Sequence, residues 1–217
     1  MASSQSKLSP SEQRGLDARL AAIRSMPAPI PASERYKHTI ETVEAGGFFR
    51  LEGLTYRVQG RHAYRDGDGP NASEWWELEL LCLQNGETAY LEWEKDDRIE
   101  ASMSLKTLSW KDLRDEDGEK VDEDDLEKIV EEEDSLVYEK TTFEYDDDSQ
   151  ARFFRDGEEG EGEPVWIVDF EAKDGTTLTI EEWGGEDGGD WEYDLSLSRR
   201  IDPDDIGVLV EKAGSTH

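Results

Sequence analysis

Two glutamates in matching contexts carry the strongest chemical signal in this chain. Glu92 stands in LEW and Glu181 in IEEW, so each lies close before a tryptophan, Trp93 or Trp183. Glycoside hydrolysis uses two carboxyl groups on opposite sides of the scissile bond. These four residues are the ligand-binding candidates, as a polar rim on a tryptophan-lined groove. The alternative is two solvent-facing strand residues, because among 55 Asp and Glu some pair always matches.

Other familiar site chemistries find no support in the sequence. Cys82 is the only cysteine, which excludes an intrachain disulfide and a cysteine-based zinc site. A calcium loop with Gly118 at its sixth position would have Leu113 as its first ligand, and leucine offers no side-chain oxygen. No Gly-x-Ser-x-Gly or phosphate-binding glycine motif occurs, and the three histidines are scattered at His38, His62 and His217. We predict no catalytic residue, cofactor or specific metal site, only non-specific cation binding.

An internal repeat surrounds these glutamates. The tripeptide Arg-Asp-Gly occurs at 65–67 and again at 155–157. The same spacing of 90 residues relates Trp76 to Trp166, Leu80 to Phe170 and Trp93 to Trp183, while Gly86 matches Gly175 one residue earlier. We infer a tandem duplication and expect Trp76 and Trp166 to be core anchors. The shift in spacing predicts a bulge at Glu182, which would re-aim Trp183 towards a cleft.

Alternating apolar and polar residues predict a mainly β fold. LTYRVQG, WWELELLCL and TAYLEWE each have a period of two, and QNG between the last two predicts a hairpin turn. We predict two similar antiparallel β-meander units, packed as a sandwich or as paired half-barrels. The predicted segments are an N-terminal amphipathic helix and Pro-rich linker (1–33), a first β repeat (47–110), an acidic connecting helix (111–134), a second β repeat (135–200) and a C-terminal segment with a frayed end (201–217).

The first segment opens with a helix-start signal. Ser9 precedes Pro10, and Glu12 completes a Ser-x-x-Glu capping box. Leu16 and Leu20 then recur at helical spacing on one face. We expect this face to pack on the body of the protein or on a protein partner, so Leu16 and Leu20 are the partner-binding candidates.

The charge of the chain narrows the classes of partner. Its 217 residues include 55 acidic and 24 basic side chains, a net charge of −31. Nucleic acids and anionic membrane surfaces attract basic proteins, so neither is an expected partner. The sequence contains no secretion signal and no apolar run of about 18 residues, which favours a cytoplasmic protein without membrane insertion. A surface rich in Asp and Glu is typical of proteins from salt-accumulating prokaryotes. The alternative is an ordinary acidic protein with one acidic insert.

Several segments resemble one known family. FFRLEGLTYRVQG, WWELELLCL with AYLEWE, and ARFFRDGEEGEGEPVWIVDFEAKDGTTLTIEEW with WEYDLS are similar to the domain of unknown function numbered 4178, over residues 47–200. Some relatives carry a Cys-rich zinc ribbon, where this chain has a helix and a Pro-rich linker. The family is bacterial and archaeal, has no settled activity, and many members accompany envelope-stress proteins. The resemblance therefore implies a soluble accessory or adaptor role and carries over no functional residue.

The sequence leaves three functions open. The first is a non-enzymatic binding or adaptor module for an unknown protein partner, using the seam between the repeats or the N-terminal helix. The second is a hydrolase acting on a sugar or small polar substrate through paired carboxylates, which requires a deep pocket and a carboxyl group of raised pKa. The third is a salt-buffering structural protein without a defined site.

Overall fold

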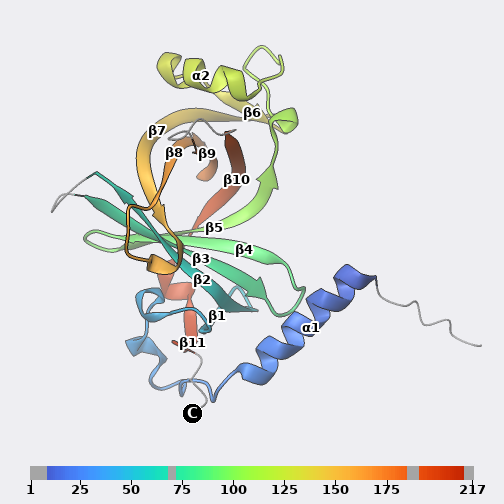
Figure 1. Cartoon of the computed structure of the whole chain (residues 1–217), viewed down its shortest axis with the longest axis vertical. Helices are drawn as coiled ribbons and strands as arrows, with labels where there is room; N and C mark the ends of the chain where they lie inside the picture. The colour runs from blue at the N-terminus through green and yellow to red at the C-terminus, as the bar shows by residue number, and fades with distance from the viewer. Residues whose placement is uncertain (1–8, 68–71, 185–190, 213–217) are drawn as a thin grey trace, which may run out of the picture. The chain divides into compact units, whose positions relative to one another are not determined.

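The chain folds into a mainly β structure. A computed structural model describes residues 9–67, 72–184 and 191–212, and contains one eleven-stranded antiparallel sheet (Figure 1). Its helices are α1 (Pro10–Ser25) and α2 (Leu126–Glu132). Its strands are β1 (Phe48–Leu51), β2 (Leu54–Asp66), β3 (Ser73–Cys82), β4 (Thr88–Lys95), β5 (Ile99–Leu108), β6 (Leu136–Tyr138), β7 (Thr141–Phe154), β8 (Glu163–Ala172), β9 (Thr176–Trp183), β10 (Glu192–Ile201) and β11 (Gly207–Val210).

The strand order shows how the sheet is built. It runs β11-β1-β2-β3-β4-β5-β10-β9-β8-β7-β6, and β2 pairs additionally with β7. Strands β1 to β5 and β6 to β10 therefore each follow one another as neighbours, and β5 pairs with β10 where the two runs meet. The mainly β, antiparallel prediction is confirmed. All strands share one sheet, so the predicted packing of two separate sheets is not confirmed.

The N-terminal helix forms as its capping signal predicts. The Ser9 side chain accepts a hydrogen bond from the Glu12 backbone N–H, and the Glu12 carboxylate accepts one from the Ser9 N–H. These two bonds satisfy donors that a helix start leaves without intrahelical partners. Ala22 is buried, whereas Leu20 and Ile23 are exposed.

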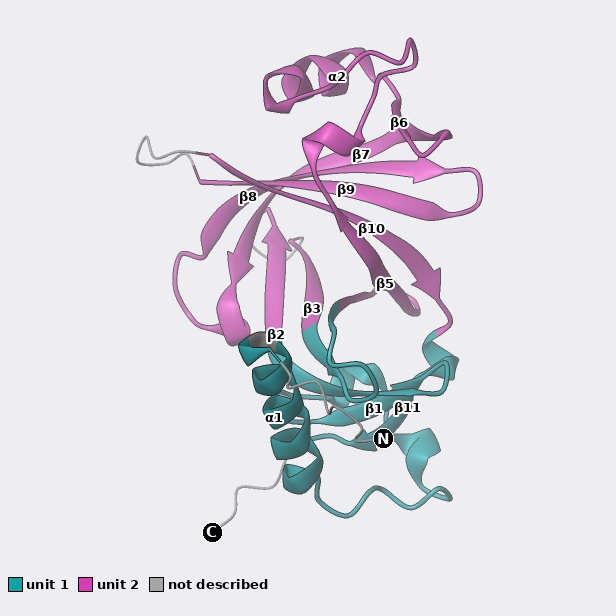
Figure 2. Cartoon of the chain, turned by 90° about the vertical axis from the view of Figure 1, so that its right-hand side faces the viewer, with its two compact units in different colours: residues 1–60, 79–89, 203–217 teal, residues 61–78, 90–202 magenta. Residues whose placement is uncertain are grey.

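The first of two compact units comprises residues 1–60, 79–89 and 203–217 (Figure 2). Within it, β1 pairs with β11, and Phe48, Leu209 and Val210 form a buried cluster. Val208, Leu209 and Val210 of β11 are thus buried. The end predicted to be frayed, residues 213–217, lies outside the described residues.

The second unit comprises residues 61–78 and 90–202 (Figure 2). Its main core lies between α2 with its flanking turns and one face of the sheet. The buried members of this core are Leu108, Leu113, Val121, Leu126, Ile129, Leu136, Tyr138, Phe143, Val168, Phe170, Ala172, Leu178, Ile180, Leu195 and Leu197. Leu126 and Ile129 of α2 are buried here, at the helical spacing seen in the sequence.

The acidic connection is less helical than predicted. Only Leu126–Glu132 is α-helical, preceded by a short 3-10 turn at Glu123–Asp125. Upstream, Gly118 has a positive φ of 85°, and Arg114 forms an isolated bridge with Lys120. This local turn geometry prevents a continuous helix across 111–134.

The predicted bulge at Glu182 is wrong. The register of β9 with β8 runs without interruption from Thr177 to Trp183, and its register with β10 is equally regular. The two repeats instead differ in the length of a turn. Residues 83–87 connect β3 to β4, whereas only residues 173–175 connect β8 to β9. A turn absorbs a length change without disturbing the pairing of the strands that it joins.

Candidate functional site

The curled sheet of the second unit brings together side chains from strands that are not neighbours. Strand β2 pairs with β7, β7 pairs with β8, and β8 pairs with β9, so two strands separate β2 from β9 along this path. The Tyr64 hydroxyl on β2 nevertheless donates a 3.2 Å hydrogen bond to Oε1 of Glu181 on β9. Paired strands lie almost 5 Å apart, so this contact requires a curled sheet with both side chains on its concave side. We call that side the inner face.

Strand alternation assigns further residues to the inner face. On β8, Val165, Ile167 and Asp169 follow at two-residue spacing, and on β9 Thr179 precedes Glu181 by two. The Thr179 hydroxyl donates a 2.6 Å hydrogen bond to Asp169 Oδ1. The buried apolar cluster of this face is Tyr64, Ala151, Phe153, Val165 and Ile167, with Trp75 and Trp183 packed against it. The inner face is therefore apolar and aromatic in one part and acidic in another.

Glu181 is the acid that the surrounding protein perturbs most. Burial raises its pKa to about 8, and the charge of Glu92 adds to this rise. The hydrogen bond from Tyr64 acts in the opposite direction, because it stabilises the ionised carboxylate. At neutral pH the Glu181 carboxyl is thus mostly protonated.

Glu92 and Asp169 belong to the same acidic group. Burial, followed by the charge of Asp169, raises the pKa of Glu92 to about 7. Burial raises the pKa of Asp169 to about 6, partly offset by the hydrogen bond from Thr179. Glu92, Asp169 and Glu181 remain half-buried, so part of each side chain is accessible although protein surrounds it. The two glutamates that the sequence singles out therefore act on each other electrostatically.

Trp183 lies beside this acidic group. Its ring is 5.2 Å from Phe153 and 6.5 Å from Tyr64, centroid to centroid. Its indole N–H is buried and has no acceptor among the described residues. A buried donor without a partner costs free energy, so this N–H would gain from an oxygen supplied by a ligand or a water molecule. Regular alternation along β9, and no bulge, places Trp183 on the inner face.

Trp93 occupies a different place from Trp183. It is buried and stacks on Trp76 at 6.1 Å, and the Arg61 guanidinium lies 4.2 Å from the Trp76 ring. Trp93 follows Glu92 directly, so the two side chains point to opposite faces of β4. Trp93 is therefore a packing residue outside the inner-face site.

The two tryptophans predicted as matching core anchors have unlike surroundings. Trp76 and Trp166 are both half-buried. Trp76 is sandwiched with Trp93 and Arg61, whereas the Trp166 indole N–H donates a 2.8 Å hydrogen bond to Asp148 Oδ2. Neither is fully buried, so the description as core anchors holds only in part.

A comparison with protein families shows to which family the chain belongs. A family model described as a domain of unknown function (DUF4178) matches residues 44–203, well over half of the chain. The chain belongs to the DUF4178 family. The resemblance over residues 47–200 is thereby confirmed. No curated protein matches the chain, and no solved structure matches it either. The family brings no activity, so the function of this DUF4178 domain is argued from its site.

Sequence reasoning missed two members of the site, Tyr64 and Asp169. Both left a signal. Asp169 continues the alternation of Val165 and Ile167 in VWIVDF, which places a carboxyl group on an otherwise apolar strand face. Tyr64 stands in AYRDG, directly before the repeated tripeptide. Their meeting with Glu181 depends on the curl of the sheet, which no local pattern reveals.

The remaining candidates of this DUF4178 domain lie elsewhere. Leu16 of α1 is half-buried and Leu20 is exposed, and the role of both stays a prediction. Cys82 is a free, buried cysteine, as expected for a small apolar residue. Within the described ranges, no three His, Cys, Asp or Glu side chains are arranged to hold a metal ion. The helices among the described residues are too short or too polar to span a bilayer.

Proposed function

We propose that this DUF4178 domain is a non-enzymatic binding module that holds a small, uncharged, hydroxyl-bearing ligand on the inner face. The observation that carries the proposal is the meeting of Glu92, Asp169 and Glu181 beside the rings of Tyr64 and Trp183. Ligand sites typically combine aromatic walls with a few convergent polar groups and perturbed carboxyl groups. Partial accessibility of the three acids leaves them within reach of a ligand.

The protonated carboxyl of Glu181 favours a ligand hydroxyl group at its position. With a pKa of about 8, the Glu181 carboxyl is protonated at neutral pH and both donates and accepts hydrogen bonds. A ligand hydroxyl has the same double capacity. The unpartnered Trp183 N–H requires an acceptor oxygen, which a hydroxyl provides and an ammonium group does not.

A binding screen tests this proposal. The full chain is titrated at pH 7 with a panel of monosaccharides, disaccharides and linear polyols, and thermal unfolding is recorded. A ligand of the native state raises the melting temperature. We expect Glu181→Ala, which removes both the donor and the acceptor, to weaken the strongest binder about tenfold, the effect of losing one hydrogen bond to a buried group.

Glu182→Ala is the matched control, because Glu182 follows Glu181 on β9 and points to the other face of the sheet. The control removes the same functional group and should bind like the wild-type chain. Equal affinity of Glu181→Ala and Glu182→Ala, or a panel without any binder, would contradict the proposal.

A hydrolase acting on a sugar or small polar substrate is the second candidate. Its support is the pair Glu181 and Asp169, whose pKa values of about 8 and about 6 suit an acid and a base at neutral pH. The test is hydrolysis of aryl glycosides by the wild-type chain and by Asp169→Asn. Absence of turnover in the wild-type chain at pH 6 to 8 would leave binding as the function.

The adaptor role implied by the family is a further proposal, located on α1. Its support is the exposure of Leu20 and Ile23 on an otherwise polar helix. We expect a protein partner in the cytoplasm to be captured by the wild-type chain and lost with a Leu16→Ala, Leu20→Ala double variant. Capture of the same protein by the wild-type chain and by the double variant would show that this face of α1 does not bind the partner.

We also propose that the two five-strand runs arose by duplication. The support is their equal order in the sheet, the Arg-Asp-Gly tripeptides that end β2 and follow β7, and the inner-face position shared by Glu92 and Glu181. An experimental structure in which no rotation superposes residues 50–105 on 140–195 would refute the duplication and the paired units derived from it.

A further inference from the structure

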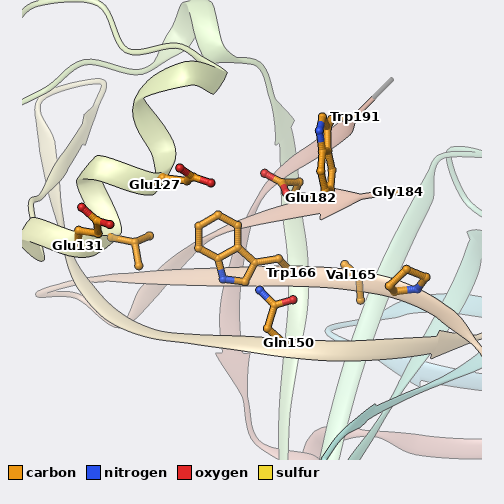
Figure 3. A pocket seen from close by; sticks show the side chains of 10 residues that line it. Glu127, Glu131, Gln150, Val165, Trp166, Glu182, Gly184 and Trp191 are labelled. Carbon is orange, nitrogen blue, oxygen red and sulfur yellow. The ribbon is translucent and has the colours of Figure 1, made fainter. Parts of the chain in front are cut away.

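A groove lies on the opposite face of the sheet, between α2 and strands β8 and β9 (Figure 3). Its volume is about 580 Å³, within the range of ligand sites. Ten residues line it, and Figure 3 shows Trp166 at its centre, with Glu127 and Glu131 on the α2 side and Glu182 and Trp191 across from them. None of the ten residues belongs to the acidic group of the inner face.

The floor of the groove is a row of directly paired residues. Gln150 on β7 pairs with Trp166 on β8, which in turn pairs with Glu182 on β9. Residues opposite each other in paired strands point to the same face, so the three side chains lie side by side. The hydrogen bond from the Trp166 indole to Asp148 fixes that ring in its place. Trp191, which is exposed, adds a second indole at the rim.

The walls of the groove carry negative charge. Glu127 and Glu131 are four residues apart, so they project from the same side of α2. Leu126 and Ile129 hold this helix against the core, which fixes the two glutamates at the edge of the groove. Glu182 stands on the opposite side and accepts a hydrogen bond from Tyr193. The ten lining residues include three glutamates and neither lysine nor arginine.

Within the described part of the chain, no basic side chain neutralises these glutamates. Among the described residues, Glu127, Glu131 and Glu182 form no salt bridge, and the nearby Lys128 pairs with Glu132 instead. The groove therefore combines two indole rings with three uncompensated carboxylates. Cations are attracted to the faces of indole rings and form charge-assisted hydrogen bonds with carboxylates. The negative charge and the aromatic lining of the groove therefore both favour a cationic group.

We propose that this groove binds an extended, arginine-containing segment of a partner protein. Arginine suits the groove because its planar guanidinium stacks on aromatic rings and also binds carboxylates with two parallel hydrogen bonds. Glu127 and Glu131, one helical turn apart, provide successive acceptors along one wall, as a chain with several cationic side chains requires. The groove is open to solvent along one side and so admits a peptide backbone that continues beyond it.

The test uses a fluorescein-labelled nine-residue peptide of alternating arginine and glycine. Its binding to the full chain is measured by fluorescence anisotropy at 0.15 M salt. Because Trp191→Ala leaves the net charge unchanged, any loss of affinity reports the groove and not the general charge of −31. We expect about twofold to fivefold weaker binding, as for the loss of one exposed cation–π contact. Circular dichroism verifies that the exposed Trp191 is dispensable for folding.

Charge-matched variants separate the groove from general attraction. Glu182→Gln and Glu34→Gln each remove one negative charge, but only Glu182 lines the groove. We expect Glu182→Gln to weaken peptide binding several-fold more than Glu34→Gln does. Glu181→Gln on the inner face should bind the peptide like the wild-type chain, because the Glu181 carboxyl is mostly protonated at neutral pH. Equal effects of Glu182→Gln and Glu34→Gln, together with unchanged binding by Trp191→Ala, would overturn the proposal and leave only diffuse electrostatic attraction.

Discussion

Glu181 links the ionisation of one side chain to the stability of the fold. Its pKa is raised from the ordinary 4.5 to about 8, so the folded chain holds this proton more tightly than the unfolded chain. The resulting stabilisation is complete below about pH 4.5 and is lost as the pH rises through about 8. We predict that Glu181→Gln is more stable than the wild-type chain at pH 9, by about 1–3 kcal/mol, and similar at pH 5. Urea unfolding at pH 5, 7 and 9 measures this difference.

Glu182→Gln provides the comparison, because it removes the neighbouring carboxyl group on the other face of β9. Its unfolding free energy should follow the wild-type dependence on pH. If Glu181→Gln also ran parallel to the wild-type curve, Glu181 would have an ordinary pKa, and the inner face would be more hydrated than its geometry indicates.

The hydroxyl of Tyr64 makes a second prediction at the level of single atoms. This O–H donates to Glu181 and lowers its pKa, against the effects of burial and of Glu92. Tyr64→Phe retains a ring that can stack on Trp75, where the centroids are 5.3 Å apart, and removes only the donor. We therefore expect the pKa of Glu181 to rise above about 8, and the chain to lose about 1 kcal/mol of stability near neutral pH. Carboxyl ¹³C chemical shifts recorded against pH give the value, and a lower pKa in the variant would contradict the assignment.

The end of α2 allows a prediction about one element. Glu133 follows the helix with a left-handed φ of 52°, and the Asp134 N–H donates to the Ile129 carbonyl. Glycine adopts this conformation without steric cost, whereas a glutamate is strained by about 1 kcal/mol. We predict that Glu133→Gly stabilises the chain by about 0.5–1 kcal/mol. Glu131→Gly, inside α2, removes the same charge but should destabilise by about 1 kcal/mol. Equal shifts of the melting temperature in the two variants would show that the removed charge, and not backbone conformation, decides.

Local patterns predicted the elements well. Ser9 and Glu12 predicted the start of α1, and the alternation in WWELELLCL and TAYLEWE predicted β3 and β4 with the turn that joins them. These signals succeed because capping bonds, turn conformations and strand periodicity involve residues close in sequence. The connecting helix is present as α2 but is shorter than the acidic segment 111–134, because a high density of Asp and Glu reports solvent exposure and not helical continuity.

The pairing of strands that are distant in sequence determines on which face of the sheet each candidate residue lies, and the sequence alone does not reveal this pairing. Trp93 and Trp183 match in the repeat, yet one side chain packs on Trp76 and the other lies on the inner face. Glu92 and Glu181, one residue closer in spacing, share that face. A shift of one residue moves a strand side chain to the opposite face of the sheet. Residues that match in the sequence repeat therefore do not necessarily occupy equivalent positions in the sheet. The curl that brings Tyr64 to Glu181 is likewise a property of the whole sheet.

At the scale of the whole molecule, acidity has two separate consequences. The acids on the inner face respond to pH, because burial shifts their pKa values into the neutral range. The many exposed acids instead stay ionised near neutral pH and repel one another. Salt screens exposed charges far more effectively than partly buried ones. The two populations are therefore distinguishable, the first by varying pH and the second by varying salt.

The net charge of −31 predicts that salt stabilises the folded chain. Repulsion among like charges opposes the compact state, and its range falls from about 10 Å at 0.1 M salt to about 3 Å at 1 M. We expect the melting temperature at pH 7.5 to rise by about 3 °C or more between these concentrations, equivalent to about 1 kcal/mol. The same salt series near pH 4 is the control, because protonation of carboxylates reduces the net charge there and should flatten the response. An increase of equal size at both pH values would assign the effect to preferential exclusion of salt, and would remove the charge-based argument for a salt-adapted protein.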